Sequence, residues 1–195
     1  MSQAHTVDPA EPAIEGVYNG KLAMWLFLCS EVMFFAGILG SYITLRIGNP
    51  AIFDESQKAL HQHVHLAAFN TMLLITSSLT MALAVLNGQK HNTAKQRFFL
   101  LLTAALGTLF ILLKFYEYNT HFGNNEYPRT DLFFAFYYGL TGIHAVHIIA
   151  GIIPIMGLWV FAKNKDVSAE TEMVGLYWHF VDLVWIFLFP LLYLV

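Results

Sequence analysis

The chain has 195 residues, of which 57% are hydrophobic and only 12% are charged, and its formal net charge is −3. A soluble globular domain has about 25% charged residues, so this composition is typical of a membrane protein. It offers no basic patch for nucleic acid, and the single cysteine, Cys29, excludes both a disulfide framework and a cysteine metal cluster.

The first 20 residues are expected to form a polar N-terminal tail. They contain Asp8, Glu11 and Glu15 but neither Lys nor Arg. A signal peptide begins with a positively charged region, so we interpret residues 1–20 as a mature tail rather than a cleaved leader.

Five apolar stretches follow, and each is long enough to cross a bilayer, which takes about 20 helical residues. They are residues 21–46, 63–86, 98–118, 132–161 and 173–195. Polar breaks separate them: Gly48-Asn49-Pro50 opens a predicted loop over 47–62, and turn-forming or charged residues occupy 87–97 and 162–172. The sequence therefore predicts an all-α fold, a five-transmembrane-helix bundle that forms one domain over residues 21–195.

The charges of the loops predict how this bundle lies in the membrane. Six cations fall on one side, namely Lys21, Lys90, Lys95, Arg97, Lys163 and Lys165, and three fall on the other, namely Arg46, Lys58 and Arg129. Loops rich in Lys and Arg stay in the cytoplasm. We therefore expect a cytoplasmic N-terminus and a C-terminus outside.

The first span carries one acid, Glu31, which lies ten residues from Lys21 and so about 15 Å along the helix, near the bilayer midplane. A charged carboxyl that faces lipid at that depth costs several kcal/mol. We therefore expect Glu31 to be neutral, to face protein, or both. The same helix has small residues at Ala36, Gly40 and Thr44, where another backbone is expected to approach closely.

Polar side chains recur in the later spans. The second span offers groups for interhelical hydrogen bonds at Asn70, Thr76, Ser77, Ser78 and Thr80. The deep ionisable residues are Glu31, His144, His147, His179 and Asp182, while Lys114 and Glu117 lie nearer the end of a span. Intramembrane polar groups usually face inward and pair with one another. We therefore expect the five deep residues to meet in one buried cluster or cleft, where each supplies the others' hydrogen bonds.

Three functions fit such a cluster. The spacing of His144 and His147 suits a metal or haem site, but no further ligand group stands out beyond His179 and the acids. A proton or ion path needs titratable groups chained across the membrane, whereas these gather at mid-depth. The third function is a structural polar core, which fixes helix register and docks a partner or a lipid headgroup. It needs neither further metal ligands nor a chain of titratable groups across the membrane, so the residues alone favour it.

Five motifs resemble a known family. They are Trp25-Leu-Phe-Leu-Cys-Ser-Glu-Val-Met-Phe-Phe35, Asn70-Thr71 with Thr76-Ser-Ser-Leu-Thr80, Phe115-Tyr-Glu-Tyr118, Leu140-Thr-Gly-Ile-His-Ala-Val-His147 and Tyr177-Trp-His-Phe-Val-Asp-Leu-Val-Trp185. In this order they resemble the short, five-helix bacterial form of cytochrome c oxidase subunit III, and the likeness covers nearly all of residues 20–195.

This resemblance implies an accessory subunit of a haem–copper terminal oxidase in the bacterial inner membrane. The complex would reduce dioxygen to water and pump protons, and haem and copper would belong to the partner subunits, with no cofactor on this chain. The chain would pack on subunit I, contact other oxidase subunits and hold phospholipid in a V-shaped cleft. The resemblance is also compatible with membership of the oxidase in a larger respiratory supercomplex. The electron donor stays open between cytochrome c and quinol, and a nitric oxide reductase accessory protein is a third alternative.

The resemblance assigns no catalytic or metal-binding residue to this chain. It makes Glu31 the family's buried helix acid, and His144, His147, His179 and Asp182 its buried polar residues, with Glu117 in a further motif. We predict that Glu31 is protonated at neutral pH, that it donates to a histidine or a backbone carbonyl on the fourth or fifth helix, and that it is not part of the pump pathway. The role of Lys114 stays open.

Overall fold

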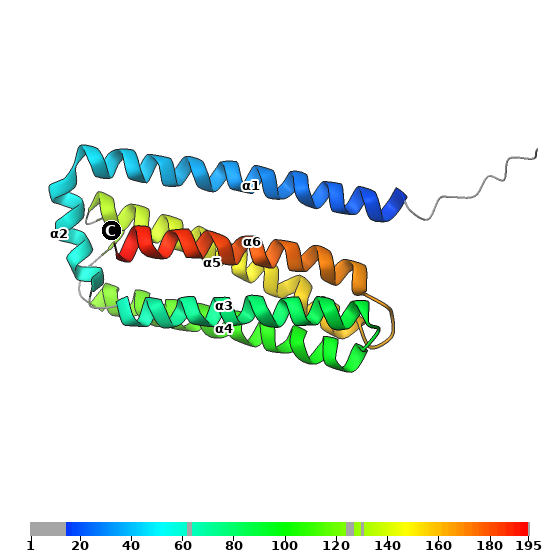
Figure 1. The fold of residues 1–195 in the computed structure, drawn as a ribbon. Coiled ribbons are helices and arrows are strands. Elements are labelled where there is room, and N and C mark those ends of the chain that lie inside the picture. Colours follow the sequence, from blue (N-terminus) through cyan, green and yellow to red (C-terminus); the bar gives the residue numbers. More distant parts are fainter. Residues whose placement is uncertain (1–14, 62–63, 124–126, 130, 195) are drawn as a thin grey trace, which may run out of the picture.

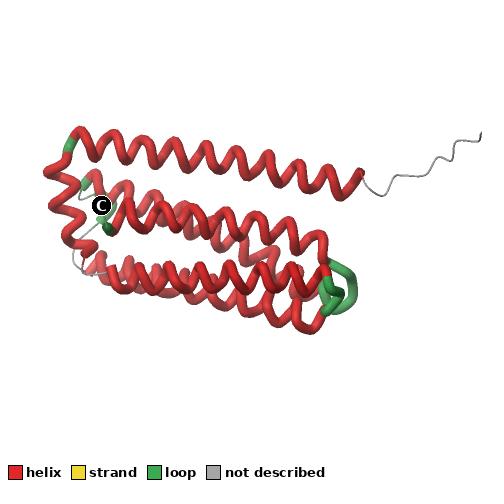
Figure 2. The backbone as a smooth tube through the Cα atoms, viewed as in Figure 1, coloured by secondary structure: helices red, strands yellow, loops and turns green. Residues whose placement is uncertain are grey.

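The computed structural model of the chain describes residues 15–61, 64–123, 127–129 and 131–194. Among these residues there are six helices and no strand (Figures 1 and 2). The helices are α1 (Glu15–Gly48), α2 (Pro50–His61), α3 (Val64–Gln89), α4 (Thr93–Gly123), α5 (Leu132–Phe161) and α6 (Ser168–Tyr193). Most of the predicted polar tail, residues 1–14, lies outside the described residues, and residues 15–20 already belong to α1.

Five of these helices, α1, α3, α4, α5 and α6, are long and apolar enough to cross a membrane. This confirms the all-α fold and the five predicted spans. The prediction for 132–161 coincides with α5, but α4 begins at Thr93 instead of 98 and α6 at Ser168 instead of 173. Both helices therefore begin in polar residues that precede the apolar stretches. At the start of α4, the Asn92 Oδ1 atom accepts a hydrogen bond of 3.3 Å from the backbone N–H of Lys95.

The predicted loop over 47–62 is wrong, because most of it forms α2, which crosses one end of the bundle (Figure 1). Pro50 does end α1, but it then opens α2, since a proline at the first helical position gives up an N–H that would have no partner there. Phe53, Gln57 and Leu60 are buried. These positions share one face of α2, which lies on the bundle end, so α2 is an amphipathic helix.

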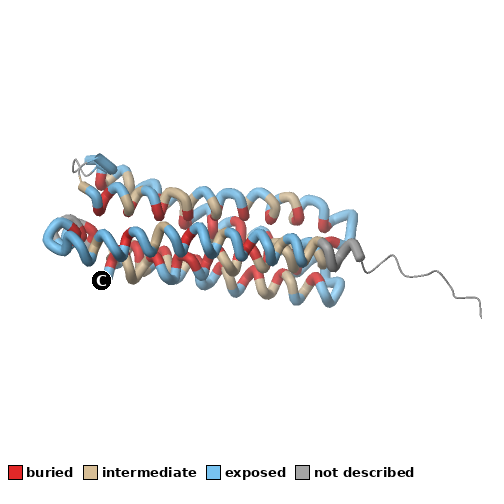
Figure 3. Tube along the Cα trace, turned by 90° about the horizontal axis from the view of Figure 1, so that it is seen from above, coloured by how far each residue is buried: buried red, intermediate tan, exposed pale blue. Residues whose placement is uncertain are grey.

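The core lies between α3, α4, α5 and α6, where buried positions face one another (Figure 3). Trp178 is one of its largest fully buried side chains. A Cβ atom placed on Gly107 would lie 2.7 Å from the Trp178 ring, and one placed on Gly151 would lie 2.8 Å from it. The indole therefore fits because two neighbouring helices present no side chain there. Its Nε1 donates a hydrogen bond of 3.1 Å to the Ser77 hydroxyl.

The predicted interhelical hydrogen bonds of the second span are confirmed for three residues. Ser77 accepts from Trp178, Ser78 contacts His179 with 2.6 Å between Oγ and Nδ1, and Thr80 contacts Thr103 with 2.7 Å between their hydroxyls. Thr76 instead donates to the carbonyl of Met72 within its own helix. Asn70 is buried, and its side-chain amide has no hydrogen-bond partner among the described residues.

Helix α1 stands apart from α3 and α4 and packs mainly on α6 (Figure 1). Its buried residues among those described are Leu28, Phe35 and Tyr42; partly buried Glu31 and Ile38 fall between them, and partly buried Met24 precedes them. Alternating steps of four and three residues make a narrow seam, as in coiled coils.

Among the described residues, nothing makes the close approach predicted at the small residues of α1. Ala36, Gly40 and Thr44 are exposed, and a Cβ atom on Gly40 would meet no atom within 4 Å in the described part of the chain. Because α1 is apolar all round, its sequence does not reveal which face packs on the bundle. The face that packs is the one that contains Phe35, and the small residues lie outside it.

Candidate functional site

The single hydrogen-bonded cluster predicted for the five deep residues does not form. The side chains are instead distributed over separate places: Glu31 with His147, His144 on its own, and His179 with Asp182, while Glu117 lies in a further group with Lys114. Residues three apart on a helix point about 60° away from each other, so His144 and His147 reach different neighbours. Only the Glu31–His147 pair joins two of the predicted five by a hydrogen bond.

Glu31 and His147 connect α1 to α5. The distance between Glu31 Oε2 and His147 Nε2 is 3.0 Å, and each side chain is about one-fifth exposed, at 19% and 18%. The other ring nitrogen, Nδ1, lies 2.8 Å from the backbone carbonyl of Ile143. A carbonyl only accepts, so Nδ1 carries a hydrogen and one proton is shared between Nε2 and Oε2. The prediction that Glu31 reaches a histidine on the fourth span is confirmed, while its protonation stays a prediction.

His144 is fully buried between α4, α5 and α6. Its ring stacks on Trp185, with centroids 5.1 Å apart and planes inclined by 25°, and it meets the edge of Phe110 at 5.9 Å. Neither ring nitrogen has a hydrogen-bond partner among the described residues. The ring contacts of His144 are therefore aromatic packing contacts, with Phe110 on α4 and Trp185 on α6.

Glu117 and Lys114 form a buried ion pair on α4. The Lys114 Nζ atom lies 3.0 Å from Glu117 Oε2, and the two side chains are 3% and 0% exposed. The hydroxyl of Tyr137 donates to Glu117 Oε1 at 2.7 Å, and the hydroxyl of Tyr193 donates to the same oxygen. Lys114 also donates to Tyr193 and lies 4.7 Å from the ring centre of Trp185. Every charge in this group has a partner.

The roles of Lys114 and of the two tyrosines were not predicted from the sequence. The signal for the ion pair was present, because residues three apart on a helix are neighbours and an acid there can neutralise a buried cation. No comparable signal marks Tyr137 and Tyr193, since they come from other helices and ordinary tyrosines recur throughout the chain.

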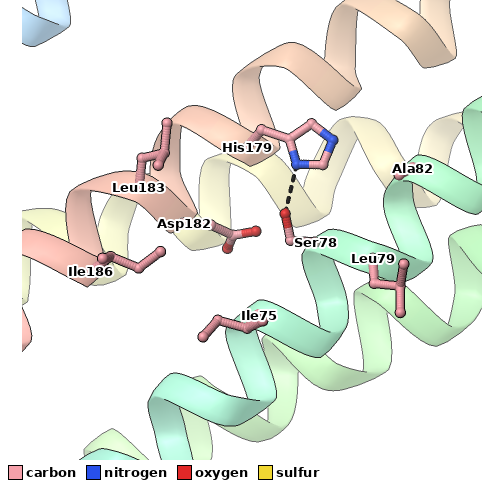
Figure 4. A pocket seen from close by; sticks show the side chains of 8 residues that line it. All are labelled: Ile75, Ser78, Leu79, Ala82, His179, Asp182, Leu183 and Ile186. Carbon is pink, nitrogen blue, oxygen red and sulfur yellow. Dashed lines mark hydrogen bonds between the residues drawn. The ribbon is translucent and has the colours of Figure 1, made fainter.

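His179 and Asp182 lie in a groove of about 400 Å³ between α3 and α6 (Figure 4). Ser78 holds His179 by the 2.6 Å contact described above, and the Asp182 carboxyl points toward the same hydroxyl (Figure 4). Asp182 is only 4% exposed, and neither of its carboxyl oxygens has a hydrogen-bond partner among the described residues. The rest of the groove is lined by aliphatic side chains.

A second depression follows the other side of α6, between α1 and α6. It comprises hollows of about 530 and 240 Å³, which share Val32, Phe180 and Leu183. Apart from His179 and Cys29, its lining is aliphatic or aromatic. Leu183 and His179 line both this depression and the α3–α6 groove, so α6 forms the ridge between them.

Within the described residues, no three His, Cys, Asp or Glu side chains come together in a way that could hold a metal ion. The deep ionisable residues of the spans are engaged in a pair, as Glu31 and His147 are, in aromatic packing, as His144 is, or in the α3–α6 groove, where His179 and Asp182 lie. Together with the five spans, this arrangement is that of a multi-pass membrane protein whose buried polar residues fix helices against one another.

Comparison with known proteins identifies the family. A family model described as cytochrome c oxidase subunit III matches residues 12–195. The chain therefore belongs to the cytochrome c oxidase subunit III family, the subunit III of haem–copper oxidases, which confirms the resemblance found in the sequence. It is accordingly a multi-pass bacterial membrane protein that forms a complex with other oxidase subunits.

Individual relatives agree with this assignment. The chain is 31% identical to “Cytochrome c oxidase subunit 3” of Alkalihalophilus pseudofirmus, over 95% of this chain and 91% of that protein. It is 32% identical to the protein of the same name from Bacillus subtilis, over 99% and 94%. It is also 26% identical to “Probable quinol oxidase subunit 3” of Staphylococcus epidermidis, over 98% and 95%.

Proposed function

We propose that this chain is the accessory subunit of a terminal oxidase that reduces dioxygen to water and pumps protons, and that haem and copper are held by its partner subunits. The observation that carries the proposal is the family match over residues 12–195. The engagement of Glu31, His147 and Glu117 with other side chains supports it, because these groups would have to leave their partners to ligate a metal.

Subunit I is the proposed direct partner, as the family resemblance implies. We further propose that the N-terminus is cytoplasmic and the C-terminus outside, because the loops on the N-terminal side carry twice as many cations. This orientation can be tested by attaching a reporter to either end of the chain and measuring which side of the membrane it occupies.

Cytochrome c is the proposed electron donor of the complex. The relatives at 31% and 32% identity carry the name cytochrome c oxidase, whereas the relative named as a quinol oxidase is 26% identical. Oxygen consumption by the purified complex with reduced cytochrome c, and separately with a quinol, distinguishes the two donors. Faster turnover with the quinol would favour the quinol oxidase alternative.

Phospholipid is the proposed occupant of the depression between α1 and α6. Its lining of Val32, Phe180 and Leu183 and their apolar neighbours suits acyl chains, and α1 contacts the bundle by a narrow seam that leaves this space open. The variant Val32→Trp would fill it, and Val160→Trp on α5 is a matched control because the two valines are similarly exposed, at 53% and 54%. We expect less phospholipid in the purified Val32→Trp complex than in the control complex.

The proposed function as a whole is tested by purification through an affinity tag on this chain. We expect haem–copper subunits to co-purify, with oxygen-reducing activity and haem absorption bands in the purified material. The same tag on an unrelated membrane protein is the control. If no haem-containing subunit accompanies the tagged chain, the proposal fails.

A further inference from the structure

The groove between α3 and α6 has the shape of a binding site for a third helix. Its two walls are Ile75, Ser78, Leu79 and Ala82 on α3, and His179, Asp182, Leu183 and Ile186 on α6 (Figure 4). Both sets follow the spacing i, i+3, i+4, i+7, which places them on one face over two helical turns. Two parallel ridges of this length enclose a trough into which the side chains of another helix can pack.

One polar group of this groove, the Asp182 carboxyl, lacks a hydrogen bond within the described residues, because the Ser78 hydroxyl toward which it points is engaged by His179 Nδ1 at 2.6 Å. Asp182 is 4% exposed and its carboxyl oxygens have no hydrogen-bond partner among the described residues, whereas Glu31 and Glu117 both have one. A buried polar group without a hydrogen bond is costly, and no water is available to supply one in the hydrocarbon region. A partner with a donor group would therefore complete the site.

The depth of the site decides which partner fits. Asp182 lies near the middle of α6 (Ser168–Tyr193), and so near the centre of the bilayer. Lipid headgroups lie about 15 Å from that centre, so a headgroup does not reach the carboxyl. An acyl chain would fill the trough but has no donor. A membrane-spanning helix, in contrast, presents side chains at every depth.

The small residues of α3 favour a close helix contact. Ser78 and Ala82 are one turn apart on the α3 wall and leave room for the approach of another backbone. Ile75 and Leu79 on the same wall are exposed, at 47% and 60%, so they are available for apolar contacts along the rim.

We propose that a transmembrane helix of another oxidase subunit docks in the α3–α6 groove and presents a hydrogen-bond donor, from a hydroxyl, amide or basic side chain, to Asp182. The proposal rests on the proposed function, since it requires that the chain assembles with other oxidase subunits. The donor and Asp182 fix the register of the two subunits, and the aliphatic rim supplies packing.

Photocrosslinking in the intact complex tests the contact without disturbing Asp182. The photoreactive residue p-benzoylphenylalanine is placed at Leu79 on the rim of the groove and, as a control, at Leu112 on α4, which is equally exposed at 61%. We expect Leu79 to crosslink to another oxidase subunit and Leu112 to crosslink to it at least about fivefold less. Crosslinking of Leu79 only to lipid, or equally from both positions, would overturn the proposal.

Substitutions then test the role of the carboxyl and of the trough. One interhelical hydrogen bond is worth about 0.6–1.7 kcal/mol, so Asp182→Leu should lower retention of the other oxidase subunits in detergent about threefold to eighteenfold. Asp182→Asn keeps an acceptor and should retain them. Ala82→Phe should have an effect like Asp182→Leu because it fills the trough, and Ala105→Phe on an exposed part of α4 should have none.

These outcomes separate the two proposals. If the wild-type chain retains no haem–copper subunit, the proposed function fails and the docking proposal falls with it. If the wild-type complex forms, the proposed function stands. If the Asp182→Leu and Ala82→Phe variants then retain the partner subunits as well as the wild type does, only the docking proposal is contradicted.

Discussion

Two buried carboxyl groups of this chain have opposite surroundings. Glu117 is 0% exposed and its oxygens meet Lys114, Tyr137 and Tyr193. Asp182 is 4% exposed, yet its oxygens have no hydrogen-bond partner among the described residues. Both lie in membrane-spanning helices, so burial alone does not say what an intramembrane acid does.

The difference indicates which acid belongs to the fold and which to an interface. The partners of Glu117 come from α4, α5 and the end of α6, so its group joins three helices within the chain. Asp182 lies at the side of the bundle, in a groove whose remaining lining is mostly aliphatic. An acid whose hydrogen bonds are complete stabilises its own chain, whereas one that lacks them is a candidate contact for a neighbour.

The largest effect is expected for Glu117→Leu. It leaves the Lys114 ammonium buried without its counterion, and breaking a buried ion pair by removing one partner costs about 3–5 kcal/mol. We expect a strongly lowered thermal midpoint for the detergent-solubilised chain. The double variant Lys114→Met with Glu117→Leu is the control, because it removes both charges and should recover much of the stability.

The comparison predicts a different result for Asp182→Leu measured in the same way. Removal of an unpartnered carboxyl costs the chain no internal hydrogen bond, so the thermal midpoint of the solubilised chain should stay near that of the wild type or rise. A loss as large as that of Glu117→Leu would show that Asp182 supports the fold, and the contrast between the two acids would then be wrong.

An intermediate effect is expected at the centre of the bundle. Gly151→Val places side-chain atoms where the Trp178 ring lies, and overpacking of a well-packed core costs about 1–3 kcal/mol. Gly157→Val is the matched control on the same helix, since a Cβ atom there meets no atom within 4 Å in the described structure. Thermal unfolding should separate the two variants clearly, and equal midpoints would contradict the packing described for Trp178.

A smaller effect is expected at the seam of α1. Glu31→Gln keeps a donor for His147 Nε2, so assembly, turnover and protons pumped per electron should stay near wild type. Glu31→Ala loses one hydrogen bond, worth about 1 kcal/mol, and should loosen α1. Protease accessibility of α1 in the assembled complex measures this. A Glu31→Gln complex that assembles normally but no longer pumps would place Glu31 in the proton path.

The smallest effect is expected in the exposed loop before α6. Hydrogen bonds from Ser168 lower the pKa of Asp166 below its usual value, and the nearby His91 lowers it further. A lowered pKa means that the contribution of Asp166 is complete at neutral pH and is lost only as the pH falls through that value. Because Asp166 is exposed, this contribution is small, and Asp166→Asn should lower the thermal midpoint at neutral pH only slightly and should have no effect below the pKa of Asp166.

The five spans could be predicted because length and hydropathy determine which segments cross a bilayer. Helix α2 was missed, although the spacing of Phe53, Gln57 and Leu60 carries an amphipathic pattern, because charged residues such as Asp54 and Lys58 stand between them. The helix ends were underestimated for a related reason, since polar residues at Thr93 and Ser168 begin helices that hydropathy does not mark.

The directions of the polar side chains were harder to predict. A helix that is apolar all round has no preferred face in its sequence, so the orientation of Glu31 depends on how α1 packs on α5 and α6. The pairing of Glu31 with a histidine could be anticipated, but the separation of His144 from His147 and of Asp182 from both depends on three-dimensional packing. The motifs identify these residues, but only the structure shows which neighbours each of them contacts.

The central claim is that this chain supplies no redox centre to an oxidase complex. The most direct measurement is the haem and copper content of the chain after it has been dissociated from its purified complex in mild detergent. We predict that haem and copper remain with the partner subunits, while the separated chain has no haem absorption and no stoichiometric copper. One haem or one copper ion per separated chain would contradict the account.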